Sequence, residues 1–134
     1  GTYVPVSLGR GCEQLIPAAH EIMHSLGVEH TQCRSDRDKY LTVHFENIYE
    51  SVRPNFHKLD EKENQLLVPF DFDSIMLYGP YMGSQNGQAT MTANDPNQKF
   101  RDTYEKDGMS ELDIKALNKL YKCEKYGSQF EYDD

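Results

Sequence analysis

The sequence predicts one small domain of the α+β class. Two stretches have the pattern of helices, at about residues 14–26 and 110–123, and short runs of β-forming residues lie before and between them. The chain has 134 residues, which is enough for one domain, and we find no internal repeat and no second domain in it. Hydrophobic residues make up only 37% of the chain, so we expect a polar, soluble domain with a modest core.

Charge and hydropathy exclude several classes of partner. The formal net charge is −8, whereas nucleic acids and anionic membranes both select basic surfaces, so neither is an expected partner. The mean hydropathy is −0.77, and no apolar run approaches the length of a membrane span.

The first helix carries two histidines on one face. It is expected to begin near Gln14 or Pro17 and to end at Leu26, because proline is acceptable only in the first turn of a helix. His20 and His24 are four residues apart, which places both imidazoles on the same face, one turn from each other. Two neutral imidazoles there can reach one metal ion at about 2.0–2.1 Å, the distance that zinc prefers.

The residues around these histidines complete a pattern for catalysis. Glu21 is not needed as a ligand, and a carboxylate at this place can take a proton from a water molecule that the metal activates. Gly27 ends the helix and lets the chain turn, so that His30 returns to the metal from another direction. Three protein ligands leave one position open, which is typical of catalytic zinc sites. The alternative is structural histidines with no metal, but a chance match at five positions is on the order of one in tens of thousands.

The region before and after this pattern has weaker signals. Residues 3–8 are rich in β formers, and Pro5 would put that strand at an edge or a strand end. Residues 34–38 hold two Arg and two Asp, which suits a half-buried network of ion pairs or, alternatively, a solvated loop. The elements expected next are a short strand at 40–45, a short helix at 46–58 interrupted at Pro54, and a loop at 59–68.

The second half has one dense apolar stretch, a turn signal and a helix. Residues 70–79 include Met76 and Tyr78 and are expected to be buried or to line a site. The pair Asn86-Gly87 predicts a hairpin whose second strand is Ala89 to Thr92. Ser110-Glu111-Leu112-Asp113 is a capping box, and the helix after it places three apolar residues on one face: Ile114, Leu117 and Tyr121.

HExxHxxGxxH followed by a methionine turn is the metzincin pattern, and within that group the chain resembles the astacin family most closely. Tyr78, two residues after Met76, and the stretch at 34–38 argue against other metzincin branches. Three motifs carry the resemblance: His20 to His30, then Arg34-Ser35-Asp36-Arg37-Asp38 against the family's R-x-D-R-D, and Ser74-Ile75-Met76-Leu77-Tyr78 against its S-I-M-H-Y.

The resemblance implies a role for each residue of the site. The fold would be the metzincin zinc-protease fold, and the function that of a secreted zinc-dependent endopeptidase acting on a protein or peptide substrate. Met76 would form an apolar floor under the metal, and Tyr78 would be a further zinc ligand at rest that then hydrogen-bonds the oxyanion. One Zn²⁺ ion per chain would be bound by His20, His24 and His30. Glu21 would be the general base. The alternative function is a non-catalytic, zinc-holding astacin-like binding module.

The resemblance also implies how the domain is organised. Residues 1–123 would be the C-terminal two-thirds of a catalytic domain, with the active-site helix and the methionine turn but with its N-terminal sheet largely missing. Residues 124–134 would be a polar tail. In the family the equivalents of Cys12 and Cys123 form disulfide bonds with cysteines of the N-terminal half, whereas Cys33 is expected to be a free thiol or part of a lineage-specific bridge.

The chain departs from the family pattern at two places. Thr31 stands where relatives have a glutamate that links to the buried N-terminus of the mature enzyme, and Leu77 stands where they have histidine. Some relatives favour acidic side chains just after the cleaved bond, and a basic residue in the corresponding pocket of this chain is expected among three candidates: Lys99, Arg101 and Lys106.

Overall fold

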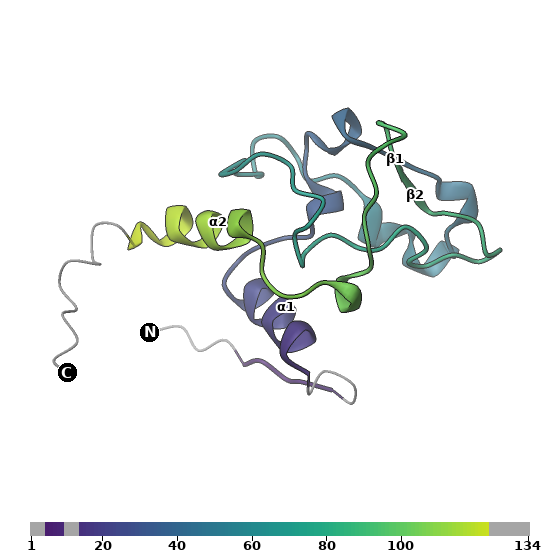
Figure 1. The fold of residues 1–134 in the computed structure, drawn as a ribbon. Helices are drawn as coiled ribbons and strands as arrows, with labels where there is room; N and C mark the ends of the chain where they lie inside the picture. The colour runs from purple at the N-terminus through teal and green to yellow at the C-terminus, as the bar shows by residue number, and fades with distance from the viewer. Residues whose placement is uncertain (1–4, 10–13, 124–134) are drawn as a thin grey trace, which may run out of the picture.

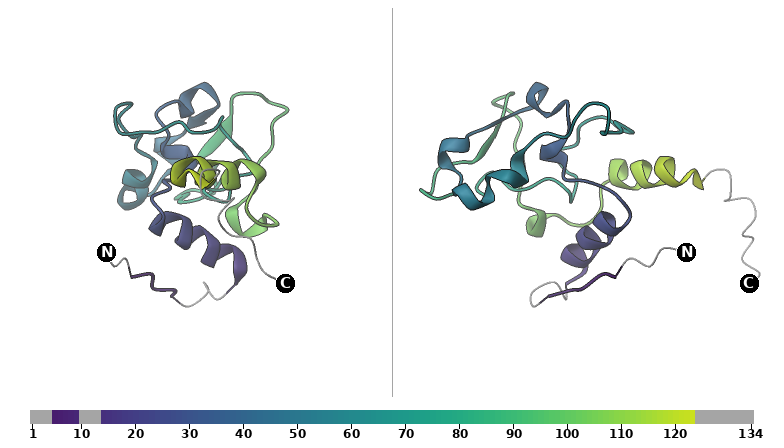
Figure 2. Two further views of the ribbon diagram at one scale, coloured as in Figure 1. Left: turned by 90° about the vertical axis from the view of Figure 1, so that its left-hand side faces the viewer. Right: turned by 180° about the vertical axis from the view of Figure 1, so that it is seen from behind.

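The computed structural model describes residues 5–9 and 14–123 of the protein. Over these residues it contains the mixture of helix and strand that the sequence predicts (Figure 1). The two strands lie at the end of the molecule away from α2 (Figures 1 and 2). Helix α1 lies below the irregular segments between the strands and α2 (Figures 1 and 2). The α-helices are α1, Leu15–Ser25, and α2, Glu111–Tyr121, the strands are β1, Leu41–Val43, and β2, Met91–Ala93, and the short 3₁₀ helices are Thr31–Cys33, Arg37–Lys39, Phe45–Asn47, Glu50–Phe56 and Thr103–Glu105.

Helix α1 begins and ends where the sequence predicts. Pro17 lies in the first turn, where its missing N–H removes no helical hydrogen bond. Gly27 follows the helix with φ of +86° and donates its N–H to the carbonyl of His24 at 2.9 Å. The chain therefore reverses there and brings the next residues back beside the helix.

Strand β2 exists, but the predicted hairpin is wrong. β2 pairs antiparallel with β1, with Val43 opposite Met91, so its partner lies far away in the sequence. Leu41 and Met91 are buried in the same core cluster, and the burial of both strands outweighs the local turn signal. Asn86 still forms a turn, since its Oδ1 accepts from the backbone N–H of Gln88 at 3.0 Å.

Two further expectations change. Residues 5–9 form no strand, because none of the described segments pairs with them, and the rest of the predicted strand, residues 3 and 4, lies outside the described residues. Residues 46–58 are helical, but as two 3₁₀ helices rather than one helix interrupted at Pro54. Pro54 lies inside the second of them, Glu50–Phe56, and the buried ring of Phe56 anchors that segment. The loop at 59–68 is confirmed, with no helix or strand.

The charged stretch at 34–38 forms the half-buried network rather than a solvated loop. Arg34 forms an ion pair with Asp36, with Nε and Oδ1 2.8 Å apart. Arg37 is buried and donates to two backbone carbonyls, those of Gln32 and Phe56, at 2.7 Å each. The network ties the 3₁₀ helices that follow the third histidine to each other.

Two hydrophobic clusters meet at the methionine turn, residues 74–77. Leu77 belongs to the larger cluster, together with Leu41, Ile48, Phe56, Phe70 and Met91. Met76 and Ile75 belong to the smaller cluster and pack against Met23 of α1. The turn is therefore buried on both sides, as the dense apolar stretch predicts.

Helix α2 has the predicted capping box. The Ser110 hydroxyl accepts from the N–H of Asp113 at 3.0 Å, and the Asp113 carboxylate accepts from the N–H of Ser110 at 3.1 Å. The apolar face is only partly covered, since Leu117 packs against the smaller cluster while Ile114 and Tyr121 remain 48% and 50% exposed. Within the described residues, neither this helix nor any other is long and apolar enough to cross a membrane.

Gly79, directly after Tyr78, lies against the backbone of Asp102. A methyl group at Gly79 would lie 2.8 Å from Cα and 2.5 Å from Oδ2 of Asp102. Gly79→Ala is therefore expected to lower the free energy of unfolding by about 1–3 kcal/mol, measured by urea unfolding. Gly9→Ala is the control, because a methyl group there meets nothing within 4 Å. Equal stability of the two variants would contradict this close approach.

Candidate metal centre

Three histidine side chains converge on one point. His20 and His24 come from one face of α1, and His30 comes from the segment that returns after Gly27. The Nε2 atoms of His20 and His24 are 3.1 Å apart, and that of His30 lies 3.2 and 3.0 Å from them. The structure thus brings together all three predicted histidine ligands.

Hydrogen bonds to backbone carbonyls set the tautomer of two of these histidines. Nδ1 of His20 lies 2.7 Å from the carbonyl oxygen of Ile75, and Nδ1 of His24 lies 2.9 Å from that of Val28. A carbonyl oxygen can only accept, so Nδ1 carries the hydrogen in both rings. Each Nε2 therefore points a lone pair toward the centre of the triad, which is the arrangement that supports metal ligation.

The triad fits a zinc ion. Nitrogen ligands at about 2.0–2.1 Å in a tetrahedral site lie about 3.3–3.4 Å apart, close to the separations of 3.0–3.2 Å here. Lone pairs facing each other at this distance repel unless a cation lies between them. Among residues 5–9 and 14–123, these three histidines are the group whose ligand atoms are close enough to hold one metal ion.

Two of the histidines are held in the neutral form. Burial is the main cause that lowers the pKa of His30 to about 3, with the neighbouring His24 and His20 adding to it. Burial also lowers the pKa of His20, against the opposing effect of its bond to Ile75. A lowered pKa keeps the imidazole unprotonated down to acidic pH, and the unprotonated form is the one that binds metal.

Glu21 and Tyr78 share a cavity of about 310 Å³ with the triad. The ring centroids of Tyr78 and His30 are 4.4 Å apart. Burial is the main cause that raises the pKa of Tyr78 to about 12, so its phenol keeps its proton and can donate a hydrogen bond. The cavity is lined by Pro17, His20, Glu21, His24, His30, Tyr78, Met82, Thr103 and Tyr104.

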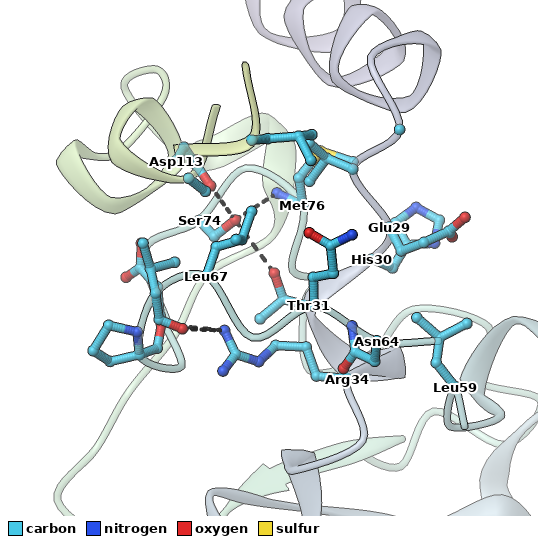
Figure 3. Close-up of a pocket in the computed structure, with 18 of the residues that line it drawn as sticks. Glu29, His30, Thr31, Arg34, Leu59, Asn64, Leu67, Ser74, Met76 and Asp113 are labelled. Carbon is cyan, nitrogen blue, oxygen red and sulfur yellow. Dashed lines mark hydrogen bonds between the residues drawn. The ribbon is translucent and has the colours of Figure 1, made fainter. Parts of the chain in front are cut away.

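The methionine turn is bonded to the third histidine through Thr31. The Thr31 N–H donates to the carbonyl of Met76 at 3.0 Å, and its hydroxyl donates to Oγ of Ser74 at 3.3 Å. Ser74 in turn donates to the carboxylate of Asp113 on α2 at 2.5 Å (Figure 3). The side chain at the first departure from the family pattern therefore joins a buried hydrogen-bonded chain.

Figure 3 also shows the cavity beside this chain of contacts, about 190 Å³ in volume, which borders His30 and Met76. Leu77, the second departure, is fully buried in the larger cluster and does not line the metal cavity. Neither Thr31 nor Leu77 lines the metal cavity.

None of the three predicted cations lines the metal cavity. Arg101 lies 3.7 Å from the carboxylate of Asp107, and Lys106 is buried under the methionine turn. The metal cavity itself therefore holds none of the basic residues that were candidates for binding an acidic side chain of the substrate.

His44 and His57 lie outside the triad, with His44 hydrogen-bonded to Thr92 at 2.9 Å.

Sequence reasoning misses the residues that hold the methionine turn. The sequence predicts Asp113 only as part of the capping box, but its burial and its bond to Ser74 connect the start of α2 to the metal centre. Lys106 and Thr103 carry no motif of their own. The capping box is the one signal that points to this region, because it predicts a fixed position for Asp113.

The two cysteines among the described residues form no disulfide bond with each other. Cys33 is buried, and burial raises its pKa to about 11, so the unreactive thiol form dominates. Cys123 is exposed, and Cys12 lies outside the described residues.

Comparison with known proteins gives consistent matches. The family model described as Astacin, a peptidase family, matches residues 1–122. Astacin-like metalloprotease toxin 1 of Loxosceles intermedia is 43% identical over 121 residues, which cover 89% of this chain and 46% of the toxin. Zinc metalloproteinase nas-31 of Caenorhabditis elegans is 42% identical over 119 residues, which cover 88% of this chain and 19% of that protein.

A solved structure agrees with these matches. High choriolytic enzyme 1, a hatching enzyme zinc-protease from Oryzias latipes, superposes with a TM-score of 0.78 and 39% sequence identity. The match covers 87% of this chain and 57% of the hatching enzyme. The chain thus spans about half the length of the toxin and of the hatching enzyme.

Proposed function

The chain belongs to the astacin family and has its metzincin fold, and on that basis we propose that it is a zinc-dependent endopeptidase that hydrolyses protein or peptide substrates. The observation that carries the proposal is the set of three Nε2 atoms 3.0–3.2 Å apart, facing a cavity that also holds Glu21 and Tyr78. Zinc-dependent cleavage of an unfolded protein is the activity that tests it.

The protein supplies the general base of the reaction. Zinc bound to the triad would polarise the carbonyl of the cleaved bond and make water a stronger nucleophile. Glu21 lines the same cavity and is not needed to hold the ion, so its carboxylate takes the proton of the attacking water. It then delivers that proton to the leaving amine. Met76, buried beside α1, provides the apolar floor under the triad.

Tyr78 would act when negative charge develops on the substrate oxygen. Its raised pKa keeps the phenol protonated, and its ring lies beside His30, so the hydroxyl is available as a neutral donor. At rest it would be a further zinc ligand and then move away to stabilise the oxyanion. A donor used only in the transition state increases kcat rather than substrate affinity.

Tyr78→Phe is therefore expected to lower kcat by about 10²-fold with little change in KM or in zinc content. The phenyl ring keeps the packing and loses only the hydroxyl. Steady-state cleavage of a fluorogenic peptide measures kcat and KM, and zinc content is measured by atomic absorption. Tyr104→Phe is the matched control, because Tyr104 lines the same cavity but its side chain is mostly exposed. A Tyr78→Phe variant with the wild-type kcat would contradict the proposed role of the Tyr78 hydroxyl.

The wider organisation follows from the same family assignment. Residues 1–123 would belong to the peptidase domain and residues 124–134, which lie outside the described residues, to a polar tail. Cys12 and Cys123 would form disulfide bonds with cysteines of an N-terminal half. A secreted protein would fit this family assignment. A toxin and a hatching enzyme among the relatives support secretion.

A further inference from the structure

Lys106 is a buried lysine that lies outside the metal cavity and lines a separate cavity together with Arg101 and Asp107. The residue is 4% exposed, and its Nζ donates to the carbonyl oxygens of Ser74 at 2.5 Å and Leu77 at 3.0 Å. These two carbonyls lie on either side of Ile75 and Met76. The ammonium group therefore bridges the two ends of the methionine turn.

Thr103 supports the same turn from the 3₁₀ helix Thr103–Glu105. Its hydroxyl lies 3.2 Å from the carbonyl oxygen of Ile75 and 3.1 Å from that of Leu77, so its single hydrogen is shared between them. The Ile75 carbonyl is also the acceptor for Nδ1 of His20. One carbonyl oxygen thus connects this threonine to a histidine of the triad.

Asp113 holds the opposite side of the turn. Its carboxylate accepts from the N–H of Ile75 at 3.0 Å. It also accepts from the hydroxyl of Ser74 (Figure 3). The hydroxyl oxygen of Ser74 also accepts from the N–H of Met76 at 3.1 Å. The peptide groups on both sides of Ile75 are therefore fixed by side-chain hydrogen bonds.

We infer that Lys106 and Thr103 are positioning residues of the metal centre: Lys106 holds the two ends of the methionine turn, and Thr103 contacts the Ile75 carbonyl that orients His20. The inference rests on the proposed zinc site and deepens it, because Lys106 does not line the metal cavity and acts only through the turn. Partners that orient a metal-binding histidine alter metal affinity when they are lost, typically by about 10–100-fold.

The test is the zinc affinity of Lys106→Met, measured in the full chain by competition with a chromophoric chelator. We expect an affinity several-fold lower than that of the wild type, because Lys106 acts through the turn and a direct partner of the histidine would cost about 10–100-fold. We also expect a changed visible absorption spectrum when Co²⁺ replaces zinc, because that spectrum depends on ligand geometry. Lys119→Met is the matched control, since Lys119 also donates to a backbone carbonyl, that of Leu67 at 2.8 Å, but that carbonyl lies outside the turn and the lysine is exposed.

A purely structural role would give a different result. Lys106→Met would then lower the melting temperature while zinc affinity and the Co²⁺ spectrum stayed like those of the wild type, which would overturn the inference. If Lys106→Met does not fold, Thr103→Val decides, because it removes one hydroxyl at nearly constant volume. Several-fold weaker zinc binding by Thr103→Val would support the inference, and unchanged binding would refute it.

These measurements are independent of peptide hydrolysis. A wild-type chain that binds zinc but cleaves nothing would contradict the proposed function and leave the result for Lys106 intact. A wild-type chain that binds no zinc would refute both.

Discussion

Replacing Glu21 by glutamine is expected to lower kcat/KM for peptide hydrolysis by at least about 10³-fold, while the protein still binds one zinc ion per chain. Glutamine has nearly the same size and shape, but its amide cannot accept the proton of the attacking water. Glu21 lies in the cavity with the triad, whereas the Nδ1 atoms of His20 and His24 bond to backbone carbonyls and not to Glu21. The ligand set should therefore survive the change.

Glu29→Gln is the matched control for this variant. Glu29 is also one residue away from a histidine of the triad, but it is exposed and does not line the metal cavity. Its variant is expected to keep the wild-type kcat/KM. Wild-type activity in Glu21→Gln, or an equal loss in both variants, would contradict the assignment of Glu21 as the base.

Replacing His24 by alanine is expected to weaken zinc binding by more than about 100-fold and to abolish hydrolysis. Loss of an outer-shell partner alone costs about 10–100-fold, and His24 contributes one of the three ligand atoms directly. Zinc should also stabilise the wild type by about 2.7 kcal/mol at a free concentration about 100 times Kd. That stabilisation should be absent in the variant when thermal unfolding is followed with and without zinc.

His44→Ala provides the comparison for His24→Ala. His44 bonds to Thr92 on β2 and lies outside the triad, so its loss should change neither zinc affinity nor the effect of zinc on the melting temperature. If His24→Ala bound zinc as tightly as His44→Ala, the three-histidine site would be wrong.

The metal centre could be predicted from the sequence because its geometry is mostly local. His20 and His24 share one helical face, and the left-handed conformation of Gly27 reverses the chain between the second ligand and the third. The capping box likewise predicts the start of α2 at the correct residue, because Ser110 and Asp113 satisfy each other's backbone groups.

The features that sequence reasoning misses depend on contacts between distant segments. β2 pairs with β1 because Met91 and Leu41 share one core, which no pattern near Asn86 reveals. The family resemblance makes Lys106 one of three candidate cations for a substrate pocket and says nothing of the methionine turn. Lysine is seldom buried, yet two carbonyls of that turn accept from Lys106. A buried charge of this kind can be recognised only in the folded structure, where its hydrogen-bond acceptors surround it.

Zinc titration of the metal-free protein, with the rate of cleavage of an unfolded, fluorescence-quenched protein substrate recorded at each step, tests the proposed function most directly. We expect the rate to rise in proportion to bound zinc and to reach a plateau at one ion per chain, with activity lost again when a chelator removes the metal. Binding of one zinc ion per chain with no cleavage at any point of the titration would contradict the endopeptidase assignment and would identify a zinc-holding binding module instead.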